Sequence, residues 1–267
     1  MSMTQQRWTG SRRALLTLGG LSLLSACANP PPPPQPQPGA PGLLPATSPP
    51  SPPPPSPSPS GLPRLPVQKK PLYVVPAASV VKGSRVVALT FDDGPHPAYT
   101  PQVLKILRKH HVKATFFVIG QQAAAHPDLV RAIVDDGHRV GTHTWSHKDL
   151  SRLPAGRIRS EVGRAVDTVA ATTGKIPDLF RAPYGSWSRP VFEVCAALGQ
   201  TSIAWDVDPR DWDNPGAGLI RSKILNQVGN RSIVLTHDGG GDRSQTVQAL
   251  RNVLPVLLDS GYRFVGV

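Results

Sequence analysis

Short apolar runs of strand length alternate with helix-like patterns from residue 85 to the end of this chain. The strand-like runs are 86–91, 114–119, 139–142, 178–181, 201–205, 232–236 and 262–267. The helix-like patterns between them are 100–110, 127–136, 155–173, 190–198, 218–228 and 244–259. Alternation of this kind predicts a parallel sheet covered by helices. Seven strands are too few for a complete eight-stranded barrel, so an α/β fold of the distorted (β/α)7 barrel type is expected.

The first 27 residues have the pattern of a bacterial export signal. Arg7, Arg12 and Arg13 form a basic start, and the apolar stretch 14–26 is too short to span a bilayer. It ends in Leu24-Ser25-Ala26-Cys27, which resembles a lipobox, where a lipoprotein is lipidated on cysteine. The paired arginines fit twin-arginine export as well as general secretion. We therefore expect an exported protein held at a membrane surface by lipid on Cys27; an ordinary signal peptide with an incidental cysteine is the alternative.

Residues 28–68 form a proline-rich linker, since about half of positions 30–66 are proline. Such a segment has too few apolar side chains for a core and favours an extended polyproline II conformation. The linker is expected to hold a folded domain, residues 85–267, away from the membrane. Residues 69–84 are expected to be a transition segment that packs along the edge of that domain.

The net charge of the chain is +12, but the charge is unevenly spread. No acidic residue precedes Asp92, and residues 71–267 carry 23 basic and 17 acidic side chains. This moderate excess fits work near a polyanionic surface such as a bacterial wall. Nucleic acid is not an expected partner, because no Lys/Arg cluster is interleaved with aromatic residues. With Cys27 lipidated, Cys195 lacks a partner and is expected to be a small buried side chain outside any disulfide.

Polar residues follow five of the predicted strands directly. They are Asp92-Asp93, 143–147, 181–185, 206–212 and 236–239. In a parallel sheet or barrel, the active site lies at the C-terminal strand ends. The five clusters therefore predict one site at that edge. Two adjacent buried carboxylates, Asp92 and Asp93, need a balancing cation there.

His143 and His147 are spaced so that one turn can present both imidazoles to one point. With one carboxylate of the Asp92-Asp93 pair they would make a set of three ligands, which leaves an open position, as in catalytic zinc sites. The other carboxylate would be free to act as a base. The same spacing is common on protein surfaces when it occurs alone. Four further histidines flank predicted helices and are expected at the surface: His110, His111, His126 and His138.

Five motifs along the chain resemble those of the polysaccharide deacetylases, the NodB-homology family or carbohydrate esterase family 4. They are Thr-Phe-Asp-Asp-Gly-Pro at 90–95, His-Thr-Trp-Ser-His at 143–147, Arg-Ala-Pro-Tyr-Gly at 181–185, Asp-Pro-Arg-Asp-Trp at 208–212 and Leu-Thr-His at 235–237. The resemblance covers about residues 86–267 and implies a distorted barrel of the NodB-homology type. Ala182 departs from the pattern, because many members carry a second proline or a bulkier residue there. We expect this difference to affect the groove and not the chemistry.

The resemblance implies a role for each polar residue at the metal. Asp93, His143 and His147 would bind one divalent metal, zinc in the first place, with cobalt or nickel as alternatives. Asp92 would be the general base that takes a proton from metal-bound water. Arg181 would pair with Asp92 and keep it ionised; a simple salt bridge at a strand end is the other interpretation.

The resemblance also implies roles around the substrate. His237 would be the general acid for the leaving amine, oriented by Asp211. The backbone N–H of Tyr184 would help to hold the oxyanion. Leu235 would line the pocket for the acetate methyl group and Trp212 a wall of the groove, although both residue types more often simply pack. Asp208 is an alternative partner for His237.

These roles predict a hydrolase, expected as a monomer, that removes acetyl groups from an N-acetylated polysaccharide. Export and a long linker favour peptidoglycan N-acetylglucosamine as the substrate. Chitin oligomers and acetylated xylan are alternatives within the same chemistry. A non-catalytic glycan-binding module is an alternative of another class, but such a relic would be expected to have lost one of the chemical residues. A nuclease or phosphatase would normally need a two-metal carboxylate cluster.

Overall fold

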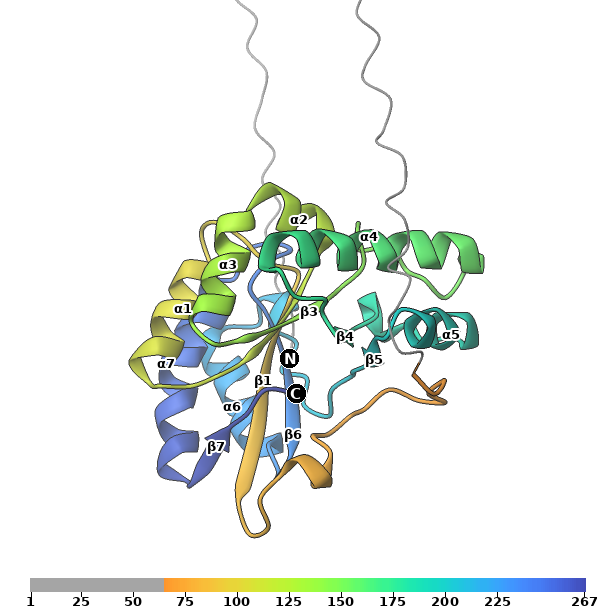
Figure 1. Ribbon diagram of the computed structural model, residues 1–267. Coiled ribbons are helices and arrows are strands. Elements are labelled where there is room, and N and C mark those ends of the chain that lie inside the picture. The colour runs from red at the N-terminus through yellow and green to blue at the C-terminus, as the bar shows by residue number, and fades with distance from the viewer. Residues whose placement is uncertain (1–64) are drawn as a thin grey trace, which may run out of the picture. The chain divides into compact units, whose positions relative to one another are not determined.

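The computed structural model describes residues 65–267 (Figure 1). The predicted signal peptide 1–27, with its predicted lipidation site at Cys27, and the predicted linker as far as residue 64 lie outside the described residues. Within residues 65–267, no helix has both the length and the apolar character needed to cross a bilayer.

The seven strands of the described chain form one parallel sheet (Figure 1). They are β1 (Arg85–Asp92), β2 (Thr115–Val118), β3 (Arg139–Thr142), β4 (Leu179–Phe180), β5 (Thr201–Ser202), β6 (Ser232–His237) and β7 (Tyr262–Phe264). Their order is β5-β4-β3-β2-β1-β6, and β7 pairs with the first residues of β1. All of these pairs are parallel. The predicted α/β fold of the distorted barrel type is confirmed.

Helices connect the strands, as the alternation predicts. They are α1 (Thr100–Lys109), α2 (Gly120–Ala125), α3 (Pro127–Asp135), α4 (Ala155–Thr173), α5 (Arg189–Ala197), α6 (Ala217–Gln227) and α7 (Ser244–Asp259). In Figure 1, α1 and α7 lie beside each other on the β1 side, and α4 and α5 lie together at the β3–β5 side. Only α2 is absent from the sequence-based expectation, because it is short and contains no large apolar residue to mark a buried face.

The segment before β1 links the two ends of the strand order. Leu72 forms a parallel bridge with Ile203, next to β5, and Val74 forms an antiparallel bridge with Ser232 of β6. The neighbouring Val75 is only 2% exposed and joins the core cluster that contains Ile203. The transition segment therefore closes the curled sheet.

Strand β1 is buried on both faces, and its alternation divides the core in two. On one face, Val87, Leu89 and Phe91 pack in a core cluster with side chains of helices such as α1 and α7. The other face carries Ala88, Thr90 and Asp92 and points toward the inner side of the curl, where Ala88 packs with residues of β2, β4 and β6. Because successive side chains on a strand point to opposite faces, the apolar pattern itself directs Asp92 inward.

His138 is buried, so its expected place at the surface is wrong. Its side chain precedes β3, is 7% exposed, and stacks at a tilt against Phe116. Nδ1 accepts a hydrogen bond from the backbone N–H of Ala114 at 3.2 Å. Nε2 is buried without a partner among the described residues. Burial therefore lowers the pKa of His138 to about 4, and the imidazole is neutral at neutral pH.

We expect His138 to destabilise the protein as the pH falls from about 6.5 to about 4. In the unfolded chain its pKa returns to the ordinary value of 6.5, so in this window the unfolded chain binds a proton that the folded protein does not. His138→Gln keeps a hydrogen-bond acceptor but does not titrate. Between about pH 7 and about pH 4.5, the wild type should lose on the order of 1 kcal/mol more unfolding free energy than this variant, measured by urea unfolding. Equal losses would contradict the prediction.

Candidate metal-dependent active site

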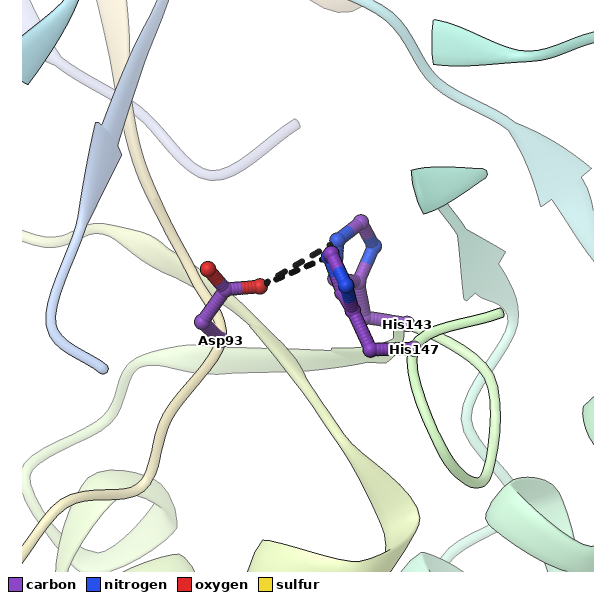
Figure 2. Close-up of side chains that lie close together, drawn as sticks. All are labelled: Asp93, His143 and His147. Atoms are coloured by element: carbon purple, nitrogen blue, oxygen red, sulfur yellow. Dashed lines mark ion pairs between the residues drawn. The ribbon is translucent and has the colours of Figure 1, made fainter. Parts of the chain in front are cut away.

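Three predicted ligands meet at the C-terminal edge of the sheet. Asp93 directly follows β1, and His143 and His147 lie on the loop after β3. Figure 2 shows both imidazoles turned toward one carboxylate oxygen of Asp93. Asp93 Oδ1 lies 3.5 Å from Nε2 of His143 and 3.1 Å from Nε2 of His147. One ligand atom from each residue lies within 4.8 Å of the other two, so the three could share one cation.

The chemistry of these donors fits a divalent metal. Asp93 Oδ1 is buried and faces the ring nitrogens of both histidines. His143 Nδ1 donates to the backbone carbonyl of Arg181 at 2.8 Å, which leaves Nε2 with a free lone pair. Burial lowers the pKa of His143, so its imidazole is neutral. Two imidazole nitrogens and one carboxylate oxygen are a typical catalytic zinc set.

The carboxylate of Asp93 is in its charged form. Burial alone would raise the pKa of Asp93, but the imidazoles of His147, His143 and His237 hold it below its ordinary value. A charged carboxylate at Asp93 and a neutral imidazole at His143 are the states in which these two side chains can bind a metal.

Left-handed backbone conformations aim the ligands. Along a regular strand Asp92 and Asp93 would point to opposite faces, but Asp93 has φ 70° and turns its side chain back toward the inner side. On the second loop, Thr144 has φ 65° and His147 has φ 57°. The Thr144 hydroxyl also accepts the backbone N–H of His147 at 2.9 Å. Positive φ at three non-glycine residues is costly and is often found at functional sites.

Asp92 pairs with a buried arginine, Arg181, which directly follows β4. Oδ1 of Asp92 accepts a hydrogen bond from Nη1 of Arg181 at 2.7 Å. Nη1 also donates to the Thr90 hydroxyl, and Nη2 donates to the carbonyl of Ala204. The guanidinium is fully buried and lies 4.1 Å above the ring of Phe117. The second oxygen of Asp92, Oδ2, lies 3.8 Å from Nε2 of His143, on the side of the candidate metal site.

His237 lies beside Asp92, at the end of the adjacent strand β6. Its Nδ1 is 2.7 Å from Oδ1 of Asp211, and its backbone N–H donates to Oδ2 of the same carboxylate at 2.9 Å. Burial alone would lower the pKa of His237, but the Asp211 carboxylate outweighs it and raises the pKa to about 9. Of the two predicted partners for His237, the structure places Asp211 in contact, whereas Asp208 accepts the backbone N–H of Arg210.

The three predicted substrate-facing residues lie on the same segments as Arg181, Asp211 and His237. Tyr184, in a short 3-10 helix (Pro183–Gly185), is 69% exposed, and its ring meets that of His147 edge-on with centroids 4.8 Å apart. Trp212 is 44% exposed, and the guanidinium of Arg210 lies 4.7 Å above its ring. Leu235 is buried on β6, two residues before His237 and on the same strand face.

Thr246 of α7 and Arg243, the residue just before this helix, support the site and were not expected from the sequence. Thr246 donates its hydroxyl to Oδ2 of Asp211 at 2.8 Å. The buried Arg243 donates to the carbonyls of Gly239, Gly240 and Trp212, and so joins the loops that carry His237 and Asp211. No sequence motif marks either residue, because each acts through a contact between distant segments.

Comparison with known proteins agrees with this arrangement. Residues 79–203 match the family model described as Polysaccharide deacetylase. A chitooligosaccharide deacetylase of Bradyrhizobium sp. is 43% identical over 194 residues, which cover 68% of this chain and 89% of that protein. A peptidoglycan-N-acetylglucosamine deacetylase of Bacillus cereus is 40% identical over 190 residues, with 70% and 89% covered.

Similarity extends to solved structures. A peptidoglycan N-acetylglucosamine deacetylase solved in complex with 4-naphthalen-1-yl-N-oxidanyl-benzamide superposes with a TM-score of 0.69 at 31% identity, covering 73% of this chain and 90% of that chain. The similarity therefore spans the curled sheet and the loops at its C-terminal edge. This chain belongs to the polysaccharide deacetylase family and is a hydrolase of carbon–nitrogen bonds.

Proposed function

We propose that this deacetylase removes the acetyl group from N-acetylglucosamine of peptidoglycan, with one zinc ion bound by Asp93, His143 and His147. The observation that carries the proposal is that the three ligand residues lie together with two further polar side chains. These are Asp92, which pairs with Arg181, and His237, which pairs with Asp211. When bound, a divalent cation supplies Lewis acidity, which activates water and polarises a carbonyl group.

Asp92 acts as the general base in this proposal. Its Oδ1 accepts a hydrogen bond from the buried Arg181 guanidinium, which pairs the carboxylate with a cation and fixes its orientation. Its Oδ2 faces the ligand set and is the oxygen that can take a proton. Asp93 is unsuited to this role because its own oxygen points between the two imidazoles. The two adjacent acids therefore divide the tasks of base and ligand.

His237 acts as the general acid for the departing amine. Because its pKa is raised to about 9, the imidazole carries a proton at neutral pH and can donate it from Nε2. Its other nitrogen, Nδ1, stays engaged with Asp211, which keeps the ring oriented. The backbone N–H of Tyr184 would stabilise the oxyanion, with Leu235 beside the acetyl methyl group and Trp212 beside the sugar.

Peptidoglycan is favoured as the substrate by the predicted export signal, the lipidation site at Cys27 and the long proline-rich linker. From these features we also infer an extracytoplasmic, lipid-anchored protein. The relatives are named both for peptidoglycan and for chitooligosaccharide deacetylation at similar identities, so chitin oligomers are the second candidate substrate. A purely glycan-binding role is disfavoured, because such a relic would be expected to have lost Asp92, His237 or a metal ligand, and the sequence retains all of them.

The substrate is tested by acetate release from three polymers offered side by side. The full-length protein, with and without a chelator, is given peptidoglycan, chitin oligomers and acetylated xylan. We expect chelator-sensitive release that is fastest from peptidoglycan. Faster release from chitin oligomers would transfer the proposal to that substrate, and release from acetylxylan alone would indicate an esterase. A metal-loaded protein that releases no acetate would support the glycan-binding alternative.

Replacement of Asp92 by Asn should separate metal binding from turnover. The amide cannot take a proton, so we expect kcat to fall by about 10²–10⁴-fold. Zinc content, measured by atomic absorption, should stay at the wild-type level because Asp92 is not a ligand. Retained turnover would remove Asp92 from the role of base, and loss of zinc would place it among the ligands.

His147→Ala should remove one of three metal ligands. We expect zinc content after dialysis to fall at least about tenfold, with acetate release lost in parallel. His110→Ala, a histidine at the end of α1 and away from the site, is the matched control and should keep its zinc. Undiminished zinc in the His147 variant would show that the ligand set is wrong.

A further inference from the structure

The loop that carries both histidine ligands is strained and needs support from outside. Residues 143–147 include two non-glycine residues in the left-handed region, Thr144 and His147. Such conformations persist only where surrounding structure holds them. The ligand geometry therefore depends on whatever fixes this loop.

One side of the loop is held by backbone hydrogen bonds to α2. The carbonyl of Thr144 accepts the N–H of Gly120 at 2.9 Å, and the carbonyl of Trp145 accepts the N–H of Gln121 at 3.0 Å. A side chain at position 120 would collide with the Trp145 ring, since a Cβ there would lie 2.6 Å from it. The backbone N–H of Ser146, the residue before His147, takes no part in these contacts with α2. It is bound by another group.

Glu161 of α4 is that group. Its Oε2 accepts the backbone N–H of Ser146 at 2.9 Å, and the Ser146 hydroxyl lies 2.9 and 3.0 Å from its two carboxylate oxygens. The Glu161 residue is only 9% exposed, which is unusual for a glutamate on a helix surface. One helical turn later, the guanidinium of Arg164 lies 4.0 Å above the Trp145 ring. Helix α4 thus contacts the loop at two consecutive residues, Trp145 and Ser146.

We propose that Glu161 is a positioning residue that sets the metal affinity of the site by fixing the peptide before His147. The inference rests on the metal-dependent function proposed above. The Ser146 N–H donates a hydrogen bond to Glu161, and the His147 N–H donates one to the Thr144 hydroxyl. Two consecutive backbone N–H groups are therefore fixed, and this backbone directs the His147 imidazole. Partners that orient metal ligands in this way typically change metal affinity by about 10–100-fold.

A surface salt bridge does not explain the buried carboxylate. Lys148 Nζ lies 3.5 Å from Oε1 of Glu161, but the lysine side chain is 56% exposed. Exposed pairs of this kind contribute little. The contacts to Ser146 are shorter, more numerous and directed at the loop.

Zinc affinity of the full-length protein, measured by competition with a chromogenic chelator, tests the inference without reference to substrate. Glu161→Ala should bind zinc about 10–100-fold more weakly than the wild type. Glu161→Asp, which keeps the charge but is one carbon too short, should also lose about tenfold and carries the test if the alanine variant fails to fold. Glu161→Gln, whose amide can accept the Ser146 N–H and donate to its hydroxyl, should stay within about threefold of the wild type. The absorption spectrum of the cobalt-loaded protein should change in the Ala and Asp variants alone.

Asp167→Asn provides the matched control, because Asp167 lies on the same helix two turns further on. It should leave zinc affinity unchanged. Wild-type affinity in Glu161→Ala or Glu161→Asp would overturn the positioning role while leaving the proposed function intact. Equal losses in Glu161→Gln and Asp167→Asn would also overturn it, because the effect would then lack the specificity of the hydrogen bonds. A wild-type protein that binds no zinc would overturn both this inference and the metal-dependent function.

Discussion

A fully buried guanidinium, that of Arg181, is the constraint on which the site depends. A charge without access to water must be compensated, and here Asp92, the Thr90 hydroxyl and the carbonyl of Ala204 do so together. Removing one partner of such a pair typically costs about 3–5 kcal/mol. The carboxylate of Asp92 is therefore fixed by the same interaction that stabilises the inside of the curled sheet. The backbone carbonyl of Arg181 also accepts a hydrogen bond from Nδ1 of His143, so one residue orients both the proposed base and a proposed metal ligand.

The two neighbouring carboxylates differ in what compensates them. Asp92 has a permanent cation at 2.7 Å, whereas Asp93 turns a buried oxygen toward two imidazoles. A buried anionic oxygen in this position favours an additional cation. Positions 92 and 93 carry the same residue type, and the difference in their surroundings comes from backbone direction and from neighbours on other strands.

Much of this arrangement could be predicted from the sequence because it is encoded locally. The alternation of strand-like and helix-like patterns predicted a parallel sheet. The polar clusters after the strands predicted where the site residues would meet. The supports were not predictable in the same way. Helix α2 has no apolar stripe, His138 is buried by packing against Phe116, and Glu161 reaches its partner across 15 residues of chain. Each of these depends on a contact between segments that no local pattern records.

Because residues 72–75 close the sheet, they limit how far the domain can be truncated from its N-terminal side. Leu72 and Val74 cover strand edges next to β5 and in β6, and Val75 fills the inner core. A protein shortened to start at β1 would expose those edges and a gap among apolar side chains. Unpaired edges of this sort promote association between sheets of separate molecules. The smallest soluble form of the catalytic unit therefore extends before β1 and includes the transition segment 69–84.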